Sequence, residues 1–129
     1  MTGPIFDTHA HYSAHAFDAD RFALLDSLPA KGVVGVCEQA THSGDAPHVL
    51  ELAHRYPWVV AAIGIHPESL LAPEDCGADG PAPTVSIYGG DWAAEMRALA
   101  PYYDDPKVVA VGECGLDYHW PVPKDAQLA

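Results

Sequence analysis

Short apolar runs alternate along the chain with segments whose apolar residues recur at helical spacing. The runs predict strands over residues 5–9, 33–37, 58–65 and 107–112. The segments between them predict helices over residues 18–28, 45–56 and 91–104. Because strands and amphipathic helices alternate, the pattern predicts right-handed βαβ units around a parallel sheet.

An acidic residue stands at the start of each predicted helix, where a carboxylate can accept hydrogen bonds from free backbone N–H groups. These candidate N-caps are Asp18, Asp45 and Asp91. The residues expected to share an apolar face are Phe22, Leu25 and Leu28 in the first helix, Val49, Leu50, Ala53 and Tyr56 in the second, and Trp92, Met96, Leu99 and Tyr103 in the third.

The stretch of residues 67–90 interrupts this alternation. It contains four prolines and four glycines, and no residues in it have the spacing of a ligand set. Since it is long for a connection between a strand and a helix, we interpret it as a mobile loop insertion. The alternative is a functional loop over the strand ends.

Composition predicts a folded protein, because 49% of the 129 residues are apolar and only 19% are charged. No apolar run approaches the roughly 18–20 residues that cross a membrane. The N-terminal residues lack the basic and apolar regions of a signal peptide, so we expect a cytoplasmic protein with no membrane contact. The three cysteines form no C-x-x-C pair, which argues against a disulfide framework.

The charge balance is strongly acidic. Six basic residues stand against eighteen acidic ones, which gives a formal net charge of -12. This charge repels phosphate backbones at long range, so binding of nucleic acid by a basic surface is not expected. Chemistry on a phosphate would require a local counter-charge, and a metal ion is the obvious candidate.

Polar residues that suit a metal follow the first and fourth predicted strands. His9 and His11 are two residues apart on a strand, so both imidazoles project from one face toward a shared cation. The alternative is a histidine pair hydrogen-bonded to backbone carbonyls. Glu113 follows a buried strand, where an unpaired carboxylate is costly, so it requires a metal, a cation or several donors. Its alternative is a structural ion pair.

The other polar residues near the strand ends leave their roles open. His66 contacts substrate or packs under the following loop, and Asp117 either solubilises its loop or orients a ligand. Cys114 is expected to be a small buried side chain, because no base for a nucleophilic cysteine can be identified. The histidines assigned to the surface or to loops are His15, His42, His48, His54 and His119.

Three segments closely resemble the TatD family of metal-dependent hydrolases: residues 6–11, 61–67 and 109–118. Residues 123–127 are also similar to the segment that leads into the family's next helix. The resemblance implies an α/β fold, the (β/α)₈ TIM barrel, with one or two divalent ions (zinc, manganese or magnesium) at its C-terminal face. It further implies metal-dependent hydrolysis of phosphodiester bonds, with DNA as the substrate and partner.

The resemblance also implies roles for individual residues. His9 and His11 match metal ligands, Glu113 matches the carboxylate that bridges a metal pair, and His66 matches a histidine that contacts substrate. Asp7 and Asp117 are expected to orient these ligands. Two imidazoles and a carboxylate also suit zinc or manganese on chemical grounds.

The sequence lacks part of the ligand set that the family pattern requires. The family pattern requires two further histidines at later strand ends and a final aspartate as ligand and general base, and these would lie beyond residue 129. His119 is in the same loop as Glu113 and cannot replace a ligand on a following strand. Since a full barrel takes about 250 residues, residues 1–129 are expected to be its N-terminal half, with about four βα units and open edges on the first and fourth strands.

We therefore expect a deoxyribonuclease of the TatD type that is inactive as this chain alone and is completed by a C-terminal half-barrel or by self-association. Two alternatives remain open. One is a non-catalytic metal-binding half-barrel that self-associates. The other is a related, amidohydrolase-like enzyme that acts on a smaller substrate or on aminoacyl-tRNA.

Overall fold

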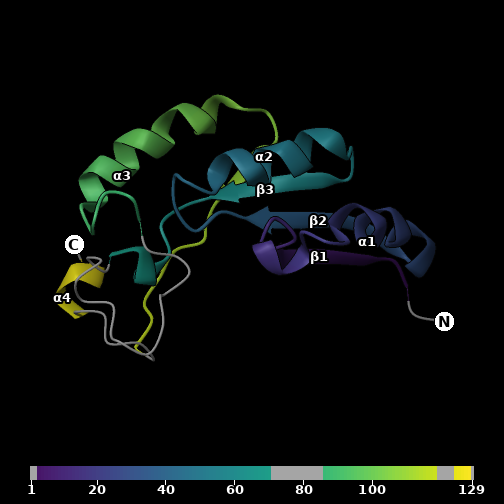
Figure 1. Cartoon of the computed structure of the whole chain (residues 1–129), viewed down its shortest axis with the longest axis horizontal. Helices are drawn as coiled ribbons and strands as arrows, with labels where there is room; N and C mark the ends of the chain where they lie inside the picture. Colours follow the sequence, from purple (N-terminus) through teal and green to yellow (C-terminus); the bar gives the residue numbers. More distant parts are fainter. Residues whose placement is uncertain (1–2, 71–85, 119–123, 129) are drawn as a thin grey trace.

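The computed structural model describes residues 3–70, 86–118 and 124–128. Its strands are β1 (Ile5–Ala10), β2 (Val33–Gln39), β3 (Val59–Ile63) and β4 (Val108–Val111). They form one parallel sheet in the order β1-β2-β3-β4 (Figure 1). The helices are α1 (Arg21–Ser27), α2 (Ala46–Arg55), α3 (Trp92–Leu99) and α4 (Lys124–Gln127). The predicted parallel α/β arrangement is confirmed.

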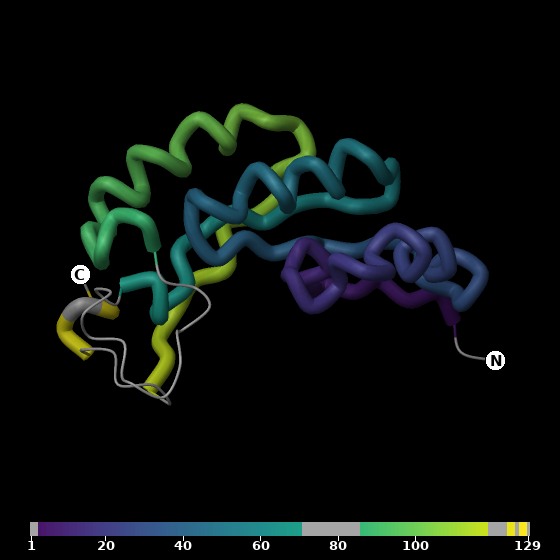
Figure 2. The backbone as a smooth tube through the Cα atoms, viewed as in Figure 1, coloured from purple at the N-terminus to yellow at the C-terminus, as the bar shows by residue number. Residues whose placement is uncertain are grey.

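The hydrophobic core lies between the sheet and the helices. Residues from β2, β3 and each of the first three helices are almost completely buried there: Val36, Val59, Ile63, Leu25, Val49 and Leu99. β1 and α1 lie at one end of the molecule, and α3 and α4 lie at the other (Figures 1 and 2).

β1 and β4 are the terminal strands of the sheet, as expected. Both carry large apolar side chains that are more than half exposed among the described residues. Phe6 is 52% exposed, and Val109 and Val111 are 59% and 70% exposed. Since parallel strands are normally buried on both faces, this exposure shows where the sheet is left uncovered.

The first helix begins later than the sequence predicts. Asp20 occupies the N-cap position of α1, and Asp18 instead accepts a hydrogen bond from Arg21 Nη2 at 2.6 Å. The prediction of Asp18 as the cap is therefore wrong, because the nearby guanidinium takes its carboxylate. Phe22 also departs from the predicted buried face, since it is exposed beneath the Arg55 guanidinium, which lies 4.1 Å from its ring centre.

The second and third helices are predicted more closely. Asp45 and Asp91 occupy the N-cap positions of α2 and α3, and all four residues predicted to face inward from α2 are buried. On α3 the prediction is partly wrong: Leu99 is buried, but Trp92 and Met96 are exposed. Glu95 takes the buried position instead, because two polar groups reach its carboxylate there, the Ser43 N–H and the Ser86 hydroxyl.

Only part of the 67–90 stretch belongs to the described residues. It begins with a 3₁₀ turn, Pro67–Leu70, in which Glu68 and Ser69 are buried. Residues 71–85 lie outside the described residues, as does His119, so the mobility of the insertion stays a prediction. Among the described helices, none is long and apolar enough to cross a membrane.

Candidate metal centre

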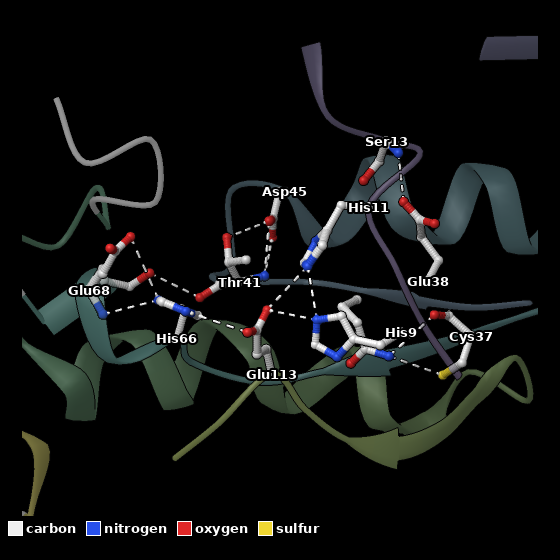
Figure 3. Close-up of polar contacts among 12 residues, drawn as sticks. His9, His11, Ser13, Cys37, Glu38, Thr41, Asp45, His66, Glu68 and Glu113 are labelled. Carbon is white, nitrogen blue, oxygen red and sulfur yellow. Dashed lines mark hydrogen bonds and ion pairs between the residues drawn. The ribbon is translucent and has the colours of Figure 1, made fainter. Parts of the chain in front are cut away.

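Three side chains from the two terminal strands meet at the C-terminal edge of the sheet (Figure 3). His9 lies near the end of β1, His11 directly follows β1, and Glu113 follows β4. The two histidine Nε2 atoms are 3.1 Å apart. Glu113 Oε2 lies 3.6 Å from His9 Nε2 and 3.3 Å from His11 Nε2. Residues about a hundred positions apart in the chain thus form one cluster.

The spacing of these three atoms fits a single cation. At zinc-to-ligand distances of 2.0–2.1 Å, the ligand atoms of a tetrahedral site lie about 3.3 Å apart. The observed separations of 3.1, 3.3 and 3.6 Å bracket that value. The side chain of His9 is 53% exposed and that of Glu113 is 23% exposed, so an ion can enter from solvent.

Backbone contacts hold Glu113 in place. Its N–H donates to the Ala40 carbonyl at 2.9 Å, and the N–H of Gly112 donates to the Ile63 carbonyl at 3.0 Å. Gly64 runs directly against this segment: a Cβ at residue 64 would lie 2.5 Å from the Glu113 carbonyl oxygen. Glycine is therefore required at position 64 for the close approach of β3 and the residues after β4.

His66 faces the other oxygen of Glu113. Its Nδ1 accepts a hydrogen bond from the Glu68 N–H at 3.1 Å, so in the neutral ring the proton lies on Nε2. That Nε2 is 3.4 Å from Glu113 Oε1. The two carboxylate oxygens of Glu113 therefore face different histidines: Oε2 lies toward His9 and His11, and Oε1 lies toward His66 (Figure 3).

The two aspartates expected to orient ligands lie close to the cluster and make different contacts. Asp7 Oδ1 accepts a hydrogen bond from the backbone N–H of His9 at 3.2 Å. The backbone N–H and carbonyl of Asp117 pair with the Gln127 side chain at 2.7 and 2.6 Å, which ties the loop after β4 to α4.

An open cleft of about 680 Å³ lies beside the cluster. His11, His66 and Glu113 line it together with the loops that follow β1 and β2. Of the histidines assigned to the surface, three also border it: His15, His42 and His48. No lysine or arginine borders the cleft within the described ranges, so its lining offers imidazoles and carboxylates without a permanent positive charge.

Two charged residues that the sequence did not single out hold the loop that follows His11. Glu38 is completely buried, and its Oε1 accepts a hydrogen bond from the Ser13 N–H at 2.6 Å. Burial raises the pKa of the Glu38 carboxyl above its ordinary value, and Oε2 has no hydrogen-bond partner among the described residues. Arg21 donates to the carbonyls of Tyr12, Ser13 and Ala14. In the sequence, Glu38 comes directly after the predicted strand of residues 33–37, and β2 extends through it to Gln39.

Cys114 is exposed, so the prediction of a small buried side chain is wrong. Gly115 has a φ of 134°, a backbone conformation that side chains with a Cβ rarely adopt.

Comparison with known proteins shows which family the chain resembles. A family model described as "TatD related DNase" matches residues 6–129. The chain is 32% identical to the "Uncharacterized metal-dependent hydrolase YabD" of Bacillus subtilis, over 95% of this chain and 42% of that protein. It is 29% identical to the "3'-5' ssDNA/RNA exonuclease TatD" of Cronobacter turicensis, over 89% of this chain and 37% of that protein.

A solved structure shows the same fold. The crystal structure of YjjV, a TatD homologue from Escherichia coli, matches with a TM-score of 0.67 and 29% identity, over 96% of this chain and 45% of that chain. The chain thus spans less than half the length of these relatives. The parallel βαβ order and this neighbour confirm the α/β fold of TIM-barrel type. The family model and the relatives together show that the chain belongs to the TatD-related DNase family.

Proposed function

We propose that this chain supplies the first metal ligands of a metal-dependent hydrolase that cleaves phosphodiester bonds in DNA. The observation that carries the proposal is the triangle of His9, His11 and Glu113 ligand atoms beside an open cleft. The names of the family and of the Cronobacter relative support this class of reaction.

The donor set favours zinc or manganese. His9 and His11 would hold the ion through Nε2, and Glu113 would hold it through Oε2. Two imidazole nitrogens suit these metals better than magnesium, which prefers oxygen ligands. When bound, such an ion supplies Lewis-acid activation of water and of a phosphoryl oxygen.

His66 would act on the substrate in this reaction. Its Nδ1 is occupied by the Glu68 N–H, so its Nε2–H is the group that faces the cluster. In the free protein this N–H lies toward Glu113 Oε1 at 3.4 Å, which is long for a hydrogen bond. It is therefore placed to donate to a phosphoryl oxygen that enters the cleft beside Glu113.

On this proposal, a C-terminal half-barrel completes both the sheet and the catalytic set. The family pattern expects a general base and further ligands after Glu113, and the relatives are more than twice as long as the matched region. Additional strands beside β4 would bury Val109 and Val111. The chain by itself is therefore expected to bind metal without hydrolysing DNA.

Two other functions each have an observation in their favour. A non-catalytic metal-binding half-barrel that self-associates would also bury the exposed apolar side chains of β1 and β4. A related hydrolase for a smaller substrate, or for aminoacyl-tRNA, is favoured by the net charge of -12 and by the lack of lysine and arginine along the described cleft lining.

The test is hydrolysis of end-labelled single-stranded DNA in the presence of zinc or manganese. One sample is this chain, and the other is a chimera in which it replaces the matching part of the Bacillus relative. We expect hydrolysis by the chimera alone, abolished by Glu113→Gln. A folded, metal-loaded chimera that leaves DNA intact would overturn the nuclease proposal. Robust hydrolysis by the chain alone would overturn the proposal that its catalytic set is incomplete. A metal-bound dimer, detected by light scattering, that hydrolyses no DNA would favour the non-catalytic alternative.

A further inference from the structure

The loop between β2 and α2, residues 40–45 and here called the β2–α2 loop, has few free backbone N–H groups. From residue 41 to residue 46, each N–H has an acceptor within the loop or on α3. The pairs are Thr41 and His42 with the Asp45 carboxylate, Ser43 with the Glu95 carboxylate, Gly44 with His42 Nδ1, and Asp45 and Ala46 with the His42 carbonyl. Because no donor is left over, the loop does not present a cradle of N–H groups for a phosphate.

Two successive carbonyls of this loop instead hold the backbone of the candidate site. The Ala40 carbonyl accepts from the N–H of Glu113 at 2.9 Å. The Thr41 carbonyl accepts from the N–H of His66 at 2.8 Å and from the Ser69 hydroxyl at 3.0 Å. The β2–α2 loop is therefore the common support of Glu113 and His66.

Asp45 fixes the conformation of this support. Its Oδ2 accepts from the Thr41 hydroxyl at 2.7 Å and from the Thr41 N–H at 2.9 Å. Its Oδ1 accepts from the His42 N–H at 3.1 Å. An aspartate at a helix start normally accepts from the first turn of its own helix. Asp45 makes no such bond to α2, so the hydrogen bonds that its carboxylate makes here all go to the β2–α2 loop.

We propose that Asp45 is a positioning residue: by bonding Thr41 and His42, it holds the Ala40 and Thr41 carbonyls at the spacing that places Glu113 between His11 and His66. The consequence for metal affinity rests on the proposed metal-binding function. The positioning itself does not. Glu95 of α3 supports the same loop at Ser43 and is itself completely buried, so the loop is anchored from both sides.

The chain offers a matched control at the start of α3. Asp91 also occupies a helix N-cap position, but its Oδ1 accepts from Ala94 of its own helix at 2.9 Å. Asp91→Ala therefore removes the same side chain from the same kind of position without touching the β2–α2 loop. Asp45→Asn is the conservative variant, because its amide keeps the shape of the side chain and one acceptor oxygen for these N–H groups, while the other oxygen is replaced by an NH2 donor.

The first measurement is amide hydrogen exchange on the metal-free chain, in conditions where the variants have equal global stability. In Asp45→Ala we expect the protection of the Glu113 and His66 amides to fall by about 10-fold or more, as the loss of a hydrogen-bonded support predicts. Asp45→Asn should give a smaller loss, and Asp91→Ala should leave both amides unchanged. Unchanged protection in Asp45→Ala would overturn the proposal.

The second measurement is zinc affinity, determined by competition with a chromophoric chelator. We expect Asp45→Ala to bind zinc about 10-fold more weakly than the wild type, because groups that orient metal ligands have effects of this size. Asp91→Ala should bind zinc as the wild type does. Equal weakening in both variants would reduce Asp45 to a general stability role and overturn the proposal. If the wild-type chain binds no zinc, the proposed function fails, and hydrogen exchange still decides the positioning role.

Discussion

Replacing Gly64 by alanine tests whether the close approach of β3 to the segment after β4 determines the geometry of the proposed metal centre. The added Cβ would lie 2.5 Å from the Glu113 carbonyl oxygen and 2.7 Å from the Gly112 carbonyl carbon. Both neighbours are backbone atoms, so neither can rotate away as a flexible side chain could. The substitution therefore has to move the backbone on which Glu113 is carried.

The required displacement follows from these distances. Ordinary contact begins at 3.4 Å, so a separation of 2.5 Å must open by roughly 0.9 Å. Metal–ligand distances hold to about 0.2 Å, so a shift of this size takes Glu113 out of reach of an ion held by His9 and His11. Overpacking of this kind costs about 1–3 kcal/mol of stability.

The assay combines urea unfolding with zinc competition on Gly64→Ala and on Gly3→Ala as control. Position 3 has open space around it, since nothing lies within 4 Å of a Cβ built there. We expect Gly64→Ala to lose about 1–3 kcal/mol of unfolding free energy and at least about 10-fold in zinc affinity, and Gly3→Ala to lose neither. A Gly64→Ala chain with wild-type zinc affinity would refute the reasoning.

Three further predictions concern the buried charge, the helix face and a second glycine. Because burial raises the pKa of Glu38 in the folded state above its ordinary value of 4.5, the folded state holds that proton more tightly. The stability of the metal-free chain should therefore fall as pH rises from that value through the raised pKa, and pH-dependent unfolding of Glu38→Gln should lack this loss. Leu99→Ala should cost about 2–5 kcal/mol in urea unfolding, whereas Met96→Ala on the exposed face should cost under about 1 kcal/mol; equal losses would contradict the observed orientation of α3. Gly35→Ala meets only the half-exposed Phe6 ring, which can rotate, so it should cost about 1 kcal/mol or less by the same measurement.

The sequence predicts the order of strands and helices and the edge of the sheet at which the site residues lie. Parallel strands bring their carboxyl ends to one edge, and the resemblance to the TatD family assigns His9, His11 and Glu113 at such ends to one metal site. His9, His11 and Glu113 do meet there. The sequence also predicts the parallel sheet, because the apolar runs are strong and alternate regularly with helical segments.

The sequence did not predict the contacts that depend on distant partners. Helical spacing on α3 is compatible with a buried Met96, and only the positions of Ser43 and Ser86 explain why Glu95 is buried instead. Asp45 was expected as a helix cap, and it occupies that position, but its carboxylate turns back to Thr41. Such choices among nearby partners are settled by the tertiary fold, which local patterns do not encode.

X-ray absorption spectroscopy of the zinc-loaded chain tests the central claim most directly, because it reports the atoms around the ion. The account predicts two imidazole nitrogens and a carboxylate oxygen from the protein, at roughly 2.0–2.2 Å. Glu113→Gln should remove the carboxylate contribution, and His9→Ala or His11→Ala should each remove one imidazole. Sulfur among the neighbours, or a spectrum unchanged by Glu113→Gln, would contradict a metal centre built from His9, His11 and Glu113.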